Sequence, residues 1–150
     1  MRYVYATSKL KRYSFPTHTN ELVIDRSESA ASEVFIVLLE PGQAPPVHEH
    51  PDAEQLFYII EGEGSLVIGK RKKRYSVKPG DVVRIPPSTP HSVVSRPDKP
   101  LKYLAIDCFV NGKPAEEPTW DEHVKALCKR QGWDYNKVVV ASCSEKKRGC

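Results

Sequence analysis

Hydrophobic residues in the middle of the chain come in short runs that end at glycine or proline. Runs of this length, rich in β-branched and aromatic residues and separated by turn residues, are typical of a β-sandwich or β-barrel. No helical period occurs between residues 33 and 110. The pattern therefore predicts an all-β fold, with strands in residues 21–25, 33–39, 55–61, 65–68, 74–77, 81–85, 91–95 and 101–110.

The pattern changes to a helical one near the end of the sequence. Trp120, Val124 and Leu127 recur at i, i+4 and i+7, which places them on one helical face. Thr119 and Glu122 have the spacing of a capping box at a helix start. We expect a C-terminal helix over about residues 119–131, a short strand within 137–141, and a disordered tail over 142–150.

Length and composition indicate one globular domain. The 150 residues are 39% hydrophobic and 28% charged, and we expect a single domain with its barrel core over about residues 21–110. The sequence contains neither an apolar signal-peptide core nor a membrane-length apolar segment, so we expect a cytoplasmic protein without a membrane partner. No cysteine pair has C-x-x-C spacing, and we expect free thiols.

The charge distribution argues against a nucleic-acid partner. The net charge is only +4, and much of it lies in "KRKKR" at residues 70–74. A basic run of this kind can bind phosphates, but a run of like charges is more often a solvated surface. We expect a solvated hairpin tip here and no nucleic-acid partner.

Two histidines are spaced for a common function. His48 and His50 are two residues apart, so in an extended segment they project to the same side. Two imidazoles on one face can hold a divalent metal. His91 begins another predicted strand about 40 residues later. His18 and His123 fit no ligand spacing; we expect His18 in a loop, and His123 either facing solvent or packed against the barrel.

Two stretches of the sequence resemble the motifs of the cupin superfamily. The first motif, G-x5-H-x-H-x3–4-E-x6-G, is matched by Gly42, His48, His50, Gln55 and Gly62. The second motif, G-x5-P-x-G-x2-H-x3-N, is matched by Gly80, Pro86, Ser88, His91 and Ser95. Three positions depart from the pattern: Gln55 replaces Glu, Ser88 replaces Gly and Ser95 replaces Asn.

The resemblance implies a double-stranded β-helix, the jelly-roll or cupin barrel, with one divalent transition metal inside (Mn, Fe, Ni, Co or Zn). By the same resemblance the metal ligands are His48, His50, Gln55 and His91. Strand alternation allows only one of Glu54 and Gln55 to face inward. The spacing to Gly62 favours Gln55, and Glu54 is the alternative.

Four residues near this stretch are candidates for the pocket: Glu54, Phe57, Tyr58 and Arg84. Phe57 and Tyr58 are neighbours in a strand, so one of them faces the pocket and the other faces outward. Arg84 is unusual within an apolar run. It either faces the lumen, where it would pair with a substrate carboxylate, or faces outward, where it would pair at the sheet surface or at a dimer contact.

The proposed ligands are all neutral, so a bound dication would keep its full charge and attract an anionic or enolate-like ligand. We expect a small metalloenzyme, an isomerase, lyase or dioxygenase, that acts on a small sugar- or carboxylate-type metabolite. The alternative is a non-catalytic sugar-type binding module. Small cupins often pair, and the apolar 33–39 run and the C-terminal helix lead us to expect a homodimer.

Overall fold

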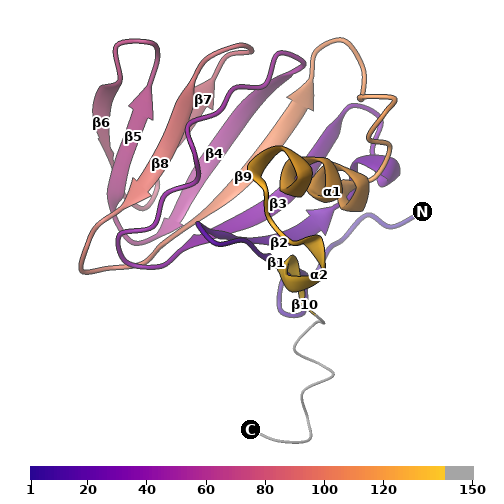
Figure 1. Cartoon of the computed structure of the whole chain (residues 1–150), viewed down its shortest axis with the longest axis horizontal. Helices are drawn as coiled ribbons and strands as arrows, with labels where there is room; N and C mark the ends of the chain where they lie inside the picture. Colours follow the sequence, from indigo (N-terminus) through magenta and orange to yellow (C-terminus); the bar gives the residue numbers. More distant parts are fainter. Residues whose placement is uncertain (141–150) are drawn as a thin grey trace, which may run out of the picture.

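Two antiparallel β-sheets and a C-terminal helix form the described part of the chain, residues 1–140 of a computed structural model (Figure 1). The strands are β1 (Lys11–Ser14), β2 (Thr19–Ile24), β3 (Ser32–Leu39), β4 (Ala53–Glu61), β5 (Gly64–Ile68), β6 (Lys73–Val77), β7 (Val82–Ile85), β8 (His91–Ser95), β9 (Leu101–Phe109) and β10 (Val139–Val140). The helices are η1 (Arg26–Glu28), α1 (Trp120–Gln131) and α2 (Tyr135–Val138). The tail expected over 142–150, with Cys143 and Cys150, lies outside the described residues.

The two sheets enclose the hydrophobic core. The larger sheet has the order β10-β1-β2-β3-β9-β4-β7, and the smaller one has the order β6-β5-β8. Period-two alternation decides which side chains face the core. Along β9 the buried positions are Leu101, Tyr103, Ala105, Asp107 and Phe109. The expected all-β fold with a C-terminal helix is confirmed.

The structure contains one strand that the sequence did not reveal and changes another. β1 pairs with β2 and β10 at the end of the larger sheet, although only Tyr13 among its four residues is apolar. So short and polar a run carries no strand signal. The prediction of a strand within residues 137–141 is partly wrong, because Lys137 and Val138 belong to α2. Only Val139–Val140 is a strand, and it pairs with β1.

Helix α1 packs against the larger sheet beside β3 (Figure 1). Its capping box is present: the Thr119 hydroxyl accepts a hydrogen bond from the backbone N–H of Glu122, and the Glu122 side chain accepts one from Thr119. Gly132 ends the helix with φ 72°. The ring of Trp120 packs on Phe35, with centroids 4.7 Å apart. This contact fixes the helix over the region where the functional site lies.

Two expectations from composition concern thiols and membranes. Cys108 and Cys128, the cysteines within the described residues, are free thiols. None of the helices described in residues 1–140 is long and apolar enough to cross a membrane.

Candidate metal centre and its cavity

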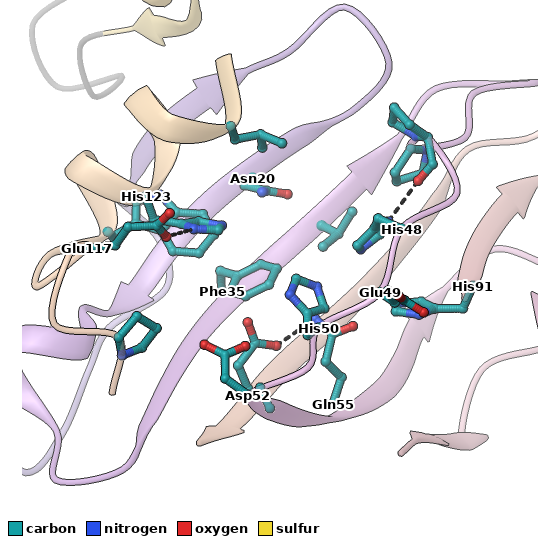
Figure 2. Close-up of a pocket in the computed structure, with 18 of the residues that line it drawn as sticks. Asn20, Phe35, His48, Glu49, His50, Asp52, Gln55, His91, Glu117 and His123 are labelled. Carbon is teal, nitrogen blue, oxygen red and sulfur yellow. Dashed lines mark hydrogen bonds and ion pairs between the residues drawn. The ribbon is translucent and has the colours of Figure 1, made fainter. Parts of the chain in front are cut away.

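Three histidines from two segments of the chain meet at one end of a cavity (Figure 2). His48 and His91 form an isolated antiparallel bridge, in which each backbone N–H donates to the carbonyl oxygen of the other, at 3.1 and 2.9 Å. His50 lies beside them, with its ring centroid 5.0 Å from that of His48 and 6.0 Å from that of His91. One ring nitrogen of each histidine lies within 4.8 Å of the others. The spacing suits one shared metal ion.

Backbone carbonyls fix the tautomers of two of these rings. His48 Nδ1 lies 2.7 Å from the Pro46 carbonyl oxygen, and His91 Nδ1 lies 2.8 Å from that of Thr89. A carbonyl oxygen only accepts, so Nδ1 carries the hydrogen and Nε2 keeps its lone pair. The carbonyls therefore leave Nε2 of each ring ready to bind a metal.

The histidines are held in the neutral form that binds metals. Burial, together with the neighbouring His48, lowers the pKa of His91 to about 4. Burial and both neighbouring histidines lower the pKa of His50 to about 2. The Nε2 atoms of His50 and His91 are buried and have no hydrogen-bond partner among the described residues. Buried polar atoms are normally paired, so these two are atoms that a ligand could engage.

Gln55 supplies a fourth atom to the same space. Its side chain is 3% exposed, and its Nε2 donates to Asp107 Oδ1 at 2.7 Å. Its Oε1 is buried and unpartnered within residues 1–140. Glu54 lies on the opposite face of β4, where it accepts a hydrogen bond from Arg84. The alternation of β4 thus turns Gln55, and not Glu54, toward the histidines.

The donor set fits a divalent transition metal. Three imidazole nitrogens and one amide oxygen match the mixed N/O ligands that such ions accept. Three of the four atoms are buried without partners, which is the state that a bound cation would relieve.

The other two motif departures are explained locally. Ser88 adopts φ 54°, the left-handed conformation that glycine takes at least cost, and its N–H donates to the His50 carbonyl at 2.9 Å. The Ser95 hydroxyl donates to the Glu40 carbonyl at 2.6 Å. Both serines therefore support the loops around the site.

A buried charge cluster lies behind Gln55. Arg26 donates from Nε and Nη2 to the two carboxylate oxygens of Glu33, at 2.7 and 2.8 Å. Asp107 lies beside Glu33, and burial raises the pKa of both carboxyl groups. Sequence analysis missed this cluster. Glu33 and Asp107 had a usable signal, because each occupies an inward position of an alternating strand, whereas Arg26 lies in a polar link with no pattern.

The cavity has a volume of about 460 Å³ and extends from the histidines toward helix α1. Its lining includes residues that sequence analysis did not assign to a site: His18, Asn20, Phe35, Trp120, His123 and Trp133. His18 does lie in a loop, but it is only 7% exposed, and burial lowers its pKa to about 3. His123 packs on Trp120 and lies 2.5 Å from a Glu117 carboxylate oxygen through Nδ1.

The structure corrects the expected pocket residues. Phe57 is 4% exposed and lines the cavity. Tyr58 is 49% exposed on the outer face of β4, as alternation requires. Glu54 and Arg84 form an ion pair on that outer face, so neither lines the cavity. Of the two alternatives for Arg84, the surface ion pair is the observed one.

The sequence profile of the family described as "Cupin domain" matches residues 35–107. The chain contains a cupin domain. This match spans both halves of the histidine site but ends before α1 and begins after β2.

Relatives of this cupin domain share only part of their length with it. An uncharacterized protein of Methanocaldococcus jannaschii is 38% identical over 63 residues, which cover 42% of this chain and 49% of that protein. Auxin-binding protein 5 of Zea mays is 32% identical over 68 residues, covering 41% and 45% of the two chains. The chain thus spans about half the length of these relatives.

Solved structures share the fold over most of the chain. The polyketide cyclase RemF from Streptomyces resistomycificus superposes with a TM-score of 0.64 and 23% identity, covering 76% of this chain and 82% of that one. A double-stranded β-helix protein from Klebsiella pneumoniae gives a TM-score of 0.63 and 19% identity, covering 75% and 95%. At these identities the likeness establishes the fold, and the expected double-stranded β-helix is confirmed.

Proposed function

We propose that this protein is a metal-dependent enzyme that acts on a small oxygenated metabolite. The observation that carries the proposal is the convergence of unpartnered, buried ligand atoms on one space at the end of a cavity. The metal is one divalent ion of the group Mn, Fe, Co, Ni and Zn. The ligands that we propose are His48, His50, His91 and Gln55.

Neutral ligands set the chemistry of the site. Because the imidazoles are held uncharged and Gln55 contributes an amide, the four proposed ligands themselves carry no negative charge to balance a bound dication. A bound dication would supply Lewis acidity, which polarises a carbonyl or carboxylate oxygen. The cavity walls favour such a ligand by shielding it from water, which strengthens electrostatic interactions.

A proton acceptor lies in the same cavity. His123 donates from Nδ1 to Glu117, and this hydrogen bond lowers the pKa of the Glu117 carboxyl to about 2. With Nδ1 committed, Nε2 is the ring atom that can take a proton from a substrate. The pairing of a carboxylate with an imidazole is a common arrangement for general-base catalysis. His123 is our candidate for that role.

One similarity favours a second function, a non-catalytic binding module. The relative from Zea mays is named for binding auxin and not for a reaction. A module of this type would use the same cavity to hold a small molecule, and the metal would anchor an acidic group of that molecule.

Elemental analysis of the purified protein tests the metal proposal. We expect about one transition metal per chain, a loss of that metal in His91→Ala, and a lower content in Gln55→Ala. Glu54→Ala is the matched control and should keep full content, because Glu54 faces away from the site. Full metal content in His91→Ala would contradict the proposed ligand set.

A metabolite panel separates the two functions. An enzyme should show turnover that disappears with a chelator. A binding module should show thermal stabilisation by a ligand without turnover.

The homodimer and the cytoplasmic location stay predictions. β3 is paired on both sides, with β2 and β9, so a dimer that extends the larger sheet would use one of its edge strands, β10 or β7, and we propose β7, the longer of the two. Val82 on that strand is 69% exposed. Analytical ultracentrifugation measures the oligomeric state, and a shift to monomer in Val82→Asp would support this edge.

A further inference from the structure

A buried amide lines the cavity away from the three histidines. Asn20, on β2, is 5% exposed, and its Oδ1 has no hydrogen-bond partner within the described residues. In Figure 2 the amide extends from β2 into the space between helix α1 and the histidines. A buried carbonyl oxygen without a donor is costly in the free protein, so its presence in a cavity wall indicates a ligand that donates to it.

The surroundings of Asn20 are aromatic. Phe35, Trp120 and Trp133 line this part of the cavity, and the His18 ring stacks on Phe15 nearby. Trp120 is 2% exposed and its Nε1 is a second buried polar atom without a partner among the described residues. Flat side chains bind flat ligands by offset or edge contacts. The faces of these rings offer no hydrogen-bond partner to the hydroxyl groups of a sugar.

We propose that the cavity takes a flat aromatic acid, with its acidic group toward the histidines and a hydroxyl or N–H group donating to Asn20. The acidic end rests on the proposed metal function, whereas the aromatic end rests on the cavity wall alone. The volume of about 460 Å³ lies within the range of small-molecule sites.

Calorimetric titration of the metal-loaded protein with three probes tests the ligand class. The probes are 6-hydroxy-2-naphthoate, 2-naphthoate and glucuronate. We expect the hydroxylated naphthoate to bind about 5–10-fold more tightly than naphthoate, because it adds one hydrogen bond. Glucuronate has the same charge and should bind at least about 10-fold more weakly than naphthoate. If glucuronate binds as tightly as naphthoate, or no naphthoate binds, the inference is wrong.

Asn20→Leu isolates the contribution of the amide. It should remove the preference for the hydroxylated probe and leave metal content unchanged. The metal-free variant should also melt about 2–4 °C higher than the wild type, because an unpaired buried acceptor is replaced by an apolar group of similar size. A retained preference for the hydroxyl, or a lower melting temperature, would contradict the role given to Asn20. A wild-type protein that binds no metal would instead refute the proposed function.

A separate observation concerns how Gln55 is held. Its Nε2 donates to Asp107 Oδ1 at 2.7 Å, and a carboxylate oxygen accepts but does not donate. The amide therefore cannot turn over without placing its own oxygen against Asp107. This contact aims Oε1 at the space that the histidines share.

The same contact accounts for an amide where the cupin motif has a glutamate. Asp107 and Glu33 are both buried, and Arg26 is the cation that lies against them. A third carboxylate at position 55 would add a like charge to a cluster with one cation, and like charges in a dry interior repel strongly. An amide at this position satisfies Asp107 and adds no charge.

We infer that Asp107 is a positioning residue that orients Gln55. In this site the carboxylate lies behind the proposed amide ligand instead of at the ligand position itself. Gln55→Glu should lower the melting temperature of the metal-free protein. The exchange Gln55→Glu with Asp107→Asn should restore it, because the exchange keeps the charge and the hydrogen bond. Recovery in the double variant separates this inference from a general loss of packing.

Cobalt titration followed by visible absorption supplies the second measurement. Asp107→Asn alone should weaken Co²⁺ binding by about 10–100-fold, the usual effect of removing a partner behind a metal ligand. Glu54→Gln is the control and should leave cobalt binding unchanged. Affinity within about twofold of the wild type in a folded Asp107→Asn protein, or an undiminished melting temperature in Gln55→Glu, would overturn the inference. If the wild type binds no cobalt, the proposed function fails, and the melting temperatures still decide the role of Asp107.

Discussion

The guanidinium of Arg26 holds both carboxylate oxygens of Glu33 in a region where neither side chain is more than 2% exposed. Arg26 also donates to the backbone carbonyl of Glu117 at 3.0 Å. This ion pair therefore joins the segment after β2 to β3 and to the loop before α1. Such a pair stabilises the fold by less than the attraction between its charges suggests, because both ions lose their hydration.

Removing one partner of that pair should be strongly destabilising. Arg26→Met leaves Glu33 buried without its cation, and we expect the free energy of unfolding to fall by about 3–5 kcal/mol. Arg84→Met removes an exposed ion pair with Glu54 and should cost about 1 kcal/mol or less. Urea denaturation of the two variants provides the comparison. Equal effects would show that the buried pair is dispensable.

Gly62, the last glycine of the first motif, should not tolerate a side chain. It has φ +82°, and a Cβ atom there would lie 2.0 Å from the Pro100 carbonyl oxygen. Gly69 has φ +79° and open space around the same position. Gly69→Ala should cost about 1 kcal/mol for its conformation alone, and Gly62→Ala about 1–3 kcal/mol more because of the clash. Thermal unfolding of both alanine variants tests this difference.

Ser88 offers a stabilising substitution. Its φ of 54° is unfavourable for any residue with a Cβ atom. Ser88→Gly should raise the free energy of unfolding by about 0.5–1 kcal/mol, the relief of strain being partly offset by the greater flexibility of unfolded glycine. Ser88→Ala, which keeps the strain, should show no such gain. A less stable glycine variant would mean that the hydroxyl contributes more than the backbone conformation costs.

The metal-free protein should lose stability in acid. Burial lowers the pKa of His91 to about 4, of His18 to about 3 and of His50 to about 2. Between the ordinary value of 6.5 and these folded-state values, the unfolded chain binds protons that the folded chain does not. Stability is therefore present above pH 6.5 and falls as the pH drops toward 4, by up to about 1.4 kcal/mol per pH unit for each histidine.

Urea midpoints measured at several pH values from 4 to 8 check this dependence. His91→Gln removes one titrating group and should reduce the slope between pH 4 and 6.5. A slope that stays the same in His91→Gln would show that the acid sensitivity arises elsewhere.

The sequence predicts the strands well, and it predicts that His48, His50 and His91 come together, because both depend on local spacing. Period-two alternation separates Gln55 from Glu54, and the structure places the two side chains on opposite faces of β4. The same rule would have marked Glu33 and Asp107 as buried carboxyl groups. Alternation did not decide whether Arg84 faces inward or outward. When apolar residues occupy both sides of a strand, the pattern does not show which side faces the core.

The other end of the cavity was not predictable from local patterns. His18 and Asn20 come from the N-terminal part, and Trp120 and His123 from the C-terminal helix. Their proximity arises because β1 and β2 belong to the part of the larger sheet against which α1 packs (Figure 1). Contacts of this kind depend on tertiary packing, which leaves no spacing signal in the sequence.

The two ends of the cavity therefore have separate origins in the chain. The cupin match at residues 35–107 contains every proposed metal ligand, but Asn20, Trp120 and His123 all lie outside it. Substitutions in the flanking segments can change which molecule enters without disturbing the proposed metal ligands. Grafting β2 and α1 from another cupin onto this barrel is thus a route to new selectivity, and relatives that share the motifs alone need not share a substrate.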